Sequence, residues 1–127
     1  TGARFLLDEN VGCGDSSSVA MRMSTTGSIF VDFPKMSAGD VYCIDVRAKG
    51  RKPMGRASWK ANGAWAQGKP DFSIVFGEPD ASGWRSAETF VTVPSGADTM
   101  SVILNAAPQH SPEDDVNFDN VHVYRIF

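Results

Sequence analysis

The side chains that most often carry acid-base or metal chemistry are scarce in this 127-residue chain. It has two histidines, His110 between prolines and His122 in an apolar stretch, and neither belongs to a recognisable metal or nucleophile motif. Paired carboxylates could in principle hydrolyse a glycosidic bond, but the candidates lie in turn-like or strand-edge stretches typical of solvated surface. These candidates are Glu78, Asp80, Glu88, Asp114 and Asp115. The motifs therefore favour a protein that is not an enzyme.

The formal net charge of −3 hides an uneven distribution of charge. Between Asp45 and Asp71 there is no acid, whereas the rest of the chain holds 15 acids and few basic residues. An asymmetry of this size indicates a binding partner. The acidic remainder would repel a long polyanion, which argues against nucleic acid as that partner. The basic residues of the segment are Arg47, Lys49, Arg51, Lys52, Arg56, Lys60 and Lys69.

A β-hairpin is predicted inside this basic segment. Asn62-Gly63 is the strongest short signal for a two-residue type I′ turn. Such a turn fixes the register, so that Lys60 pairs with Trp65. One face of the hairpin then has Trp59 among alanines, as expected of a core face. The other face is polar and cationic with an aromatic ring in its middle, and it consists of Arg56, Ser58, Lys60, Trp65, Gln67 and Lys69.

This cationic face suits a sugar chain. An indole offers an apolar plane to the C–H face of a pyranose, and Lys, Arg and Gln donate hydrogen bonds to hydroxyl or acid groups. A solvated hairpin whose tryptophan covers a sheet edge is the alternative that the same pattern leaves open. Arg85 would join the site if its strand lies in the same sheet. The predicted ligand-binding residues are Trp65, Arg56, Lys60, Gln67, Lys69 and Arg85.

Short strands must position these residues. Runs rich in Val, Ile, Phe and Met alternate with clusters of Gly, Pro, Ser and Asp, and none has a helical period. Eight to ten such strands in one domain indicate an antiparallel β-sandwich or barrel. No apolar run approaches the roughly 20 residues that span a bilayer. The predicted strands are residues 3–7, 19–23, 29–33, 41–48, 56–61, 64–67, 72–76, 89–93, 100–105 and 117–126.

Two of these strands also indicate which side chains face the core. In residues 41–48 the apolar Tyr42, Ile44 and Val46 alternate with more polar residues, which predicts one buried face. In the last strand the apolar phase slips after Phe118. A β-bulge at Asp119-Asn120 would produce this slip, and phase noise in a strand buried on both faces is the alternative.

The chain from about Ile29 onward resembles the jelly-roll carbohydrate-binding modules attached to polysaccharide-degrading enzymes. The segments that resemble them are residues 41–50, Trp84 at a strand start, residues 89–97, residues 101–104 and residues 116–123. The resemblance implies a single two-sheet β-sandwich over residues 1–127, no catalysis, and a glycan bound on the concave sheet or at its rim. It also implies an extracellular or cell-surface protein with an attached catalytic domain.

The resemblance also implies a structural calcium ion. In such modules the acid of a Phe-Asp-Asn-Val ending is often a calcium ligand, together with an acid of the first strand and backbone carbonyl groups. On this sequence these are Asp119 with Glu9 or Asp8, and the carbonyl of Lys49 or Gly50. Hard oxygen ligands of this kind suit Ca²⁺. The alternative is that Asp119 bonds its own backbone in the bulge.

Two functions are therefore considered. The first is non-catalytic binding of a polysaccharide, anionic or neutral, that holds an attached glycoside hydrolase or lyase on its substrate. The second is a structural or protein-interaction sandwich that docks on a neighbouring domain. Because Thr1 follows no charged or apolar leader, we expect that a signal peptide has been removed or that the chain is part of a longer protein. A disulfide between Cys13 and Cys43 is left open.

Overall fold

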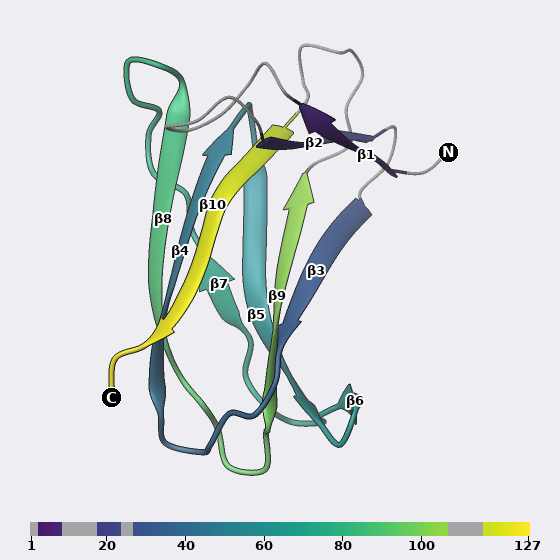
Figure 1. Ribbon diagram of the computed structural model, residues 1–127, viewed down its shortest axis with the longest axis vertical. Helices are drawn as coiled ribbons and strands as arrows, with labels where there is room; N and C mark the ends of the chain where they lie inside the picture. Colours follow the sequence, from purple (N-terminus) through teal and green to yellow (C-terminus); the bar gives the residue numbers. More distant parts are fainter. Residues whose placement is uncertain (1–2, 9–17, 24–26, 107–115) are drawn as a thin grey trace.

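Two antiparallel β-sheets pack face to face (Figure 1). The computed structural model describes residues 3–8, 18–23, 27–106 and 116–127. Within these ranges there is no helix that is long and apolar enough to cross a membrane. The strands are β1 (Ala3–Asp8), β2 (Ser18–Met23), β3 (Gly27–Phe33), β4 (Val41–Lys49), β5 (Pro53–Ala61), β6 (Ala64–Trp65), β7 (Phe72–Ile74), β8 (Trp84–Thr92), β9 (Thr99–Ala106) and β10 (Val116–Arg125).

The first sheet has the order β1-β2-β10-β4-β8, and the second has the order β3-β9-β5-β6. Strand β7 also pairs with β5, so β6 and β7 lie one after the other along the same edge of β5. The predicted all-β sandwich is therefore confirmed. Strand β8 begins at Trp84, as the resemblance implied. The apolar pattern placed the start five residues later, because the polar residues Arg85 and Ser86 interrupt it. The whole of β8 pairs with β4, from Trp84 opposite Lys49 to Thr92 opposite Val41.

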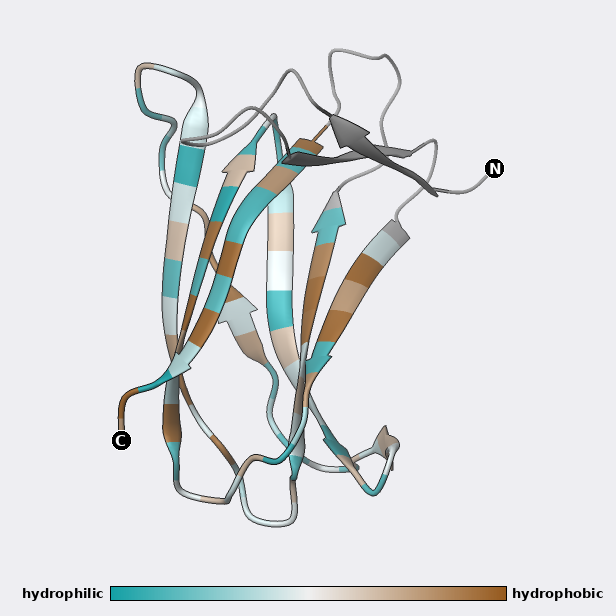
Figure 2. Cartoon of the chain, viewed as in Figure 1, coloured by the Kyte–Doolittle hydropathy of each residue, from teal (hydrophilic) through white to brown (hydrophobic). Residues whose placement is uncertain are grey.

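The inner faces of the two sheets form one hydrophobic core. Ile44 and Val46 of β4 are fully buried, as the alternation predicted, and Trp59 of β5 is 2% exposed. Figure 2 shows apolar and polar residues alternating along β10. Each large side chain buried in this way contributes roughly 1.5–3 kcal/mol to stability. The rest of the core comes mainly from Ala57, Val91, Met100, Val102, Leu104, Val116 and Phe118.

The bulge predicted in the last strand is present. Asp119 pairs with Arg47 and His122 pairs with Asp45, so β10 has one more residue than β4 between these two pairs. Asn120 takes a φ of 52°, in the left-handed region. Because of the extra residue, Phe118 before the bulge and Val123 after it both pack against the core.

The predicted hairpin is also confirmed. Asn62 and Gly63 have φ values of 54° and 78°, as a type I′ turn requires. The register pairs Lys60 with Trp65 and Ala61 with Ala64. Trp59 is therefore on the core side and Trp65 on the outer side of the second sheet, where its side chain is 50% exposed.

Candidate functional site

The outer face of the second sheet brings together side chains from four strands. Phe30 and Asp32 of β3 are opposite Ile103 and Ser101 of β9, and these are opposite Arg56 and Ser58 of β5. Lys60 of β5 is opposite Trp65 of β6. Residues that are paired in register point to the same side of a sheet. We call this surface the Trp65 face, and it consists of Phe30, Asp32, Arg56, Ser58, Lys60, Trp65, Ser101 and Ile103.

Lys60 lies at the centre of the Trp65 face. Its Nζ atom is 4.6 Å from the centroid of the Trp65 ring and 5.2 Å from that of the Phe30 ring. Both distances are within the range of a cation–π interaction. The Lys60 side chain is only 15% exposed, whereas the two rings remain 50% and 56% exposed. Two half-exposed aromatic residues with the ammonium group of the half-buried Lys60 between them therefore form the middle of this face.

Acidic partners neutralise the two cations of this face. Lys60 Nζ donates a hydrogen bond to Asp32 Oδ2 at 2.8 Å. This bond holds the pKa of Asp32 below its ordinary value, although partial burial acts in the opposite direction. Arg56 Nε is 3.6 Å from Asp71 Oδ2, and Ser58 Oγ donates to the other oxygen of the same carboxylate at 2.8 Å. The face is therefore close to neutral rather than cationic.

Phe30 and Asp32 were not among the residues predicted from the sequence. Both lie in β3, 30 and 28 residues before Lys60, outside the basic segment. They reach Lys60 because β9 pairs with β3 on one side and with β5 on the other. The alternation of β3, in which Phe30 and Asp32 share a face, was the signal available in the sequence.

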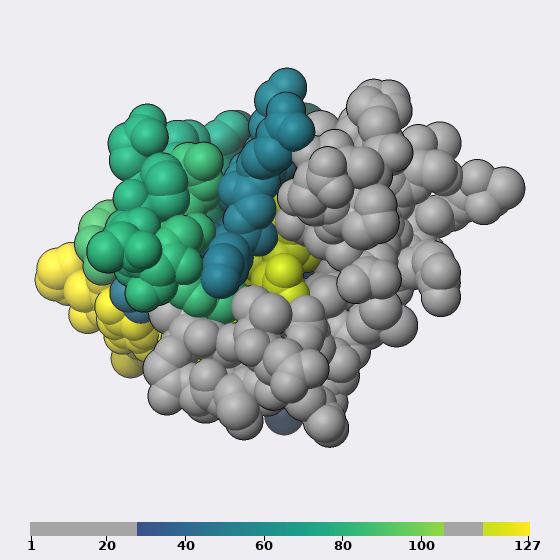
Figure 3. Space-filling model, turned by 90° about the horizontal axis from the view of Figure 1, so that it is seen from above, coloured from purple at the N-terminus to yellow at the C-terminus, as the bar shows by residue number. Residues whose placement is uncertain are grey.

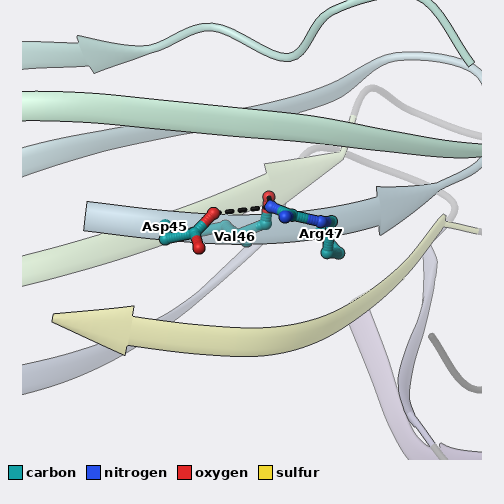
Figure 4. Close-up of polar contacts among 3 residues, drawn as sticks. All are labelled: Asp45, Val46 and Arg47. Atoms are coloured by element: carbon teal, nitrogen blue, oxygen red, sulfur yellow. Dashed lines mark hydrogen bonds and ion pairs between the residues drawn. The ribbon is translucent and has the colours of Figure 1, made fainter. Parts of the chain in front are cut away.

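The seven basic residues do not form one cationic surface. Strand β4 belongs to the first sheet and β5 to the second, so the segment is divided between the two layers. Arg47 of β4 forms an ion pair with Asp45 at 2.5 Å on the outer face of the first sheet (Figure 4). Residues 50–52 connect the sheets at one end of the sandwich. The charge asymmetry along the sequence therefore does not correspond to a single basic surface.

Arg85 does not join the Trp65 face. It lies in β8 of the first sheet, where its guanidinium donates to the carbonyl oxygens of Gly50 at 3.2 Å and Gly77 at 3.1 Å. The connection between β4 and β5 and the segment before β8 accordingly lie side by side at the end of the molecule seen in Figure 3. The expectation that Arg85 contacts the same ligand as Trp65 is wrong, because the two residues are in different sheets.

Gln67 and Lys69 lie in the turn after β6 and not in a ladder position. The strand ends at Trp65, and Gly68 takes a φ of 71°. The Nε1 atom of Trp59 donates to the carbonyl oxygen of Pro70 at 3.0 Å, which draws this turn across the edge of the sheet. Gln67 is exposed, and the ammonium group of Lys69 lies beside Gly96 in the connection to β9.

The outer face of the first sheet has a second pair of exposed aromatic residues. Phe90 of β8 and Tyr124 of β10 are both register partners of Cys43 in β4, and they are 56% and 50% exposed. Cys43 is a free thiol and is fully buried, while Cys13 lies outside the described residues. A hydrogen bond with the Cys43 thiol raises the pKa of Tyr124, and the charge of Glu88 adds to this effect.

The described residues do not by themselves form a calcium site. Asp119 Oδ1 accepts a hydrogen bond from the backbone N–H of Asn120 at 2.9 Å, and the Gly50 carbonyl accepts one from Arg85. No cluster of three His, Cys, Asp or Glu side chains is placed to hold a metal ion within the described ranges. Asp8 ends β1, and Glu9 lies outside the described residues. Calcium therefore stays a prediction that depends on these two acids.

Comparisons with known proteins identify the fold. No family model and no curated protein matches the sequence. The enzymatically active domain of bacteriophage CBA120 tailspike protein 4 contains a similar structure, with a TM-score of 0.78 and 14% identity over 99% of this chain. The CBM22-1–GH10 modules of the Clostridium thermocellum xylanase Xyn10B give a TM-score of 0.72 and 14% identity over 97%. The chain spans 18% and 24% of these two proteins.

A third similar structure is close to this chain in length. The CBM22-2 xylan-binding domain of Paenibacillus barcinonensis Xyn10C gives a TM-score of 0.68 and 14% identity over 95% of this chain and 86% of that domain. The jelly-roll fold of a carbohydrate-binding module, which the sequence resemblance implied, is therefore confirmed. At identities this low, the likeness concerns the fold.

Proposed function

We propose that this chain is a non-catalytic carbohydrate-binding module that binds a polysaccharide chain across its Trp65 face. The observation that supports the proposal most directly is the pair of half-exposed rings, Phe30 and Trp65, on the outer face of one sheet. Because both rings contact the same ammonium group, their separation is no greater than the sum of the two centroid distances. A separation within this limit is no longer than a disaccharide, so we expect neighbouring sugar units of one chain to contact both rings.

Hydrogen bonding on the same face fits neutral sugar hydroxyl groups. Asp32 is 37% exposed and can accept from a hydroxyl, while Arg56, which is 49% exposed, can donate to one. Since each cation has an acidic partner, a neutral polysaccharide is favoured over an anionic one. Xylan is the first ligand to test, because two of the similar structures are named as a xylan-binding domain and as a complex with xylohexaose.

The role of the module would be to hold an attached enzyme on its substrate. This proposal is supported by the CBM22-1–GH10 arrangement of the similar xylanase, in which a module of this fold accompanies a catalytic module. An extracellular or cell-surface location follows from a polysaccharide ligand of this kind. A structural calcium ion bound by Asp119 with Asp8 or Glu9 is part of the same proposal.

Calorimetry and affinity electrophoresis with xylan, a neutral glucan and polygalacturonate test the proposal. We expect binding to a neutral polysaccharide that raised salt does not weaken, because screening affects mainly exposed ionic contacts. We expect no release of reducing ends from any of the three. Absence of binding to a panel of neutral and acidic glycans would refute carbohydrate binding.

The second candidate is a structural module that docks on a neighbouring domain. The exposed aromatic pair on the first sheet, Phe90 and Tyr124, favours this candidate, because it offers an apolar contact area away from the Trp65 face. If docking is the function, Phe90→Ala should weaken binding to the neighbouring domain of the parent protein while glycan binding is absent. The same variant should leave glycan affinity unchanged if the first proposal is correct.

A further inference from the structure

We propose that Asp32 determines the charge preference of the site: it forms an ion pair with Lys60 and thereby excludes acidic sugars. The inference rests on glycan binding at the Trp65 face and concerns the choice between neutral and acidic ligands there. The inference requires that Lys60 can bind a carboxylate of a ligand and that Asp32 prevents this binding. It also requires that removing the Asp32 carboxylate frees the Lys60 ammonium group for the ligand. The geometry supports each requirement.

Three neighbouring side chains fix the position of the Lys60 ammonium group. Its Nζ atom lies between the rings of Trp65 and Phe30 and is 2.8 Å from Asp32 Oδ2. The side chain of Lys60 is 15% exposed and that of Asp32 is 37% exposed, so the stem of Lys60 is covered while the pair itself can be reached from solvent. A ligand carboxylate that binds Lys60 must therefore compete with Asp32 for the ammonium group, because a charge-assisted hydrogen bond already joins the two.

The charges around the pair are balanced. Asp32 belongs to β3 and Lys60 to β5, and the next charged groups are Arg56 of β5 and Asp71, just before β7, which pair with each other. From β9 the neighbouring side chain is the hydroxyl of Ser101, and Asp98, just before that strand, is bonded to the Asn62 backbone. Asp32 is therefore the one acid that bonds to Lys60 among the described residues.

An acidic sugar would meet a repelling charge at this site. A uronate carboxylate close enough to bond Lys60 would lie beside the Asp32 carboxylate, and like charges placed together oppose binding. A neutral sugar meets no such cost, because its hydroxyl groups donate to Asp32. When Asp32 is replaced by asparagine, a carboxylate on the ligand can take its place against Lys60 between the same two rings.

The test compares the parent chain with D32N on oligosaccharides of xylose and of galacturonic acid, by calorimetry at low and at high salt. We expect D32N to bind the galacturonate oligomer at least about fivefold more tightly than the parent does, equivalent to about 1 kcal/mol for one ion pair. The gain should disappear at high salt. It should also disappear in the double variant D32N/K60M, which identifies Lys60 as the group released.

D40N is the matched control for the change in net charge. Asp40 pairs with Arg125 of the first sheet at 3.7 Å, whereas the ion-pair partner of Lys60 is Asp32. We expect D40N to bind the galacturonate oligomer with the same affinity as the parent. Thermal unfolding of each variant verifies that it is folded at the temperature of the titration.

The results separate this inference from the proposed function. Binding of the xylose oligomer by the parent reports on glycan binding, and the ratio of D32N to parent on galacturonate reports on Asp32. If the parent binds the neutral oligomer but D32N gains no affinity for the acidic one, the inference is wrong and the function stands. An equal gain in D40N also overturns it, since net charge would then explain the change. If the parent binds no glycan of the panel and D32N binds neither oligomer, both fail.

Discussion

Replacing Trp65 by alanine removes one of the two rings on which we expect a sugar chain to lie. The ring is at the edge of the second sheet, with 50% of its surface open to solvent. The substitution leaves the backbone pairing of Lys60 with residue 65 possible, because alanine is compatible with a strand edge. The main expected effect is therefore on ligand affinity, with a smaller effect on stability.

The size of the effect follows from the exposed area. A tryptophan side chain has up to about 250 Å² of surface, so that about 125 Å² is open at 50% exposure. A sugar that stacks on one side of the ring covers about half of this, and at about 25 cal/mol per Å² the contact contributes about 1.5 kcal/mol. That corresponds to a loss of roughly tenfold in affinity. The cost in folding stability is that of one cation–π contact, about 0.5–1 kcal/mol.

Calorimetry with the neutral oligosaccharide that the parent binds measures the loss, and urea unfolding measures the stability. Phe30→Ala should also weaken binding, by somewhat less because its ring is smaller. Phe90→Ala provides a matched control, since Phe90 and Phe30 are both 56% exposed but lie on opposite sheets. If Trp65→Ala binds as tightly as the parent, or if Phe90→Ala loses as much affinity as Phe30→Ala, the assignment of the Trp65 face is wrong.

Four further outcomes are expected. Gly63→Ala should lower the free energy of unfolding by about 1–2 kcal/mol, measured in urea, because Gly63 has a φ of 78°. Trp59→Phe should cost about 1–3 kcal/mol in the same assay, because the Pro70 carbonyl loses its donor. Lys60→Met should lower the free energy of unfolding fully at pH values above 3.8, the ordinary pKa of Asp32, because the bond to Lys60 lowers that pKa in the folded state. The difference from the parent should shrink as the pH falls below 3.8, which urea unfolding at several pH values measures. A calcium chelator should lower the melting temperature of the parent but not of Asp119→Ala; equal shifts in both would exclude Asp119 as a ligand.

The sequence predicted features that depend on neighbouring residues. The turn at Asn62-Gly63 could be predicted because an Asn-Gly pair favours the positive φ values that the turn requires. The bulge at Asp119-Asn120 could be predicted because it shifts the apolar phase of the strand, which is also a local signal. The burial of Ile44 and Trp59 followed from alternation alone. The sequence pattern overestimated the length of β6, which ends at Trp65. The chain that follows is held by the hydrogen bond from Trp59 Nε1 to the Pro70 carbonyl, and a contact between residues 11 apart gives no local signal in the sequence.

By itself, then, the sequence determined the all-β class, the approximate positions of the strands, and the buried side of β4 and of the Asn62-Gly63 hairpin. Only the tertiary structure decided which outer surfaces coincide: it placed Arg85 in the other sheet and put Phe30 and Asp32 against Lys60. Alternation orders residues within a strand, but the pairing of β3 with β9 and of β9 with β5 depends on packing between segments far apart in the chain. For that reason the strongly basic segment is divided between the two sheets, and the part of it in β5 lies on a nearly neutral face with two aromatic rings.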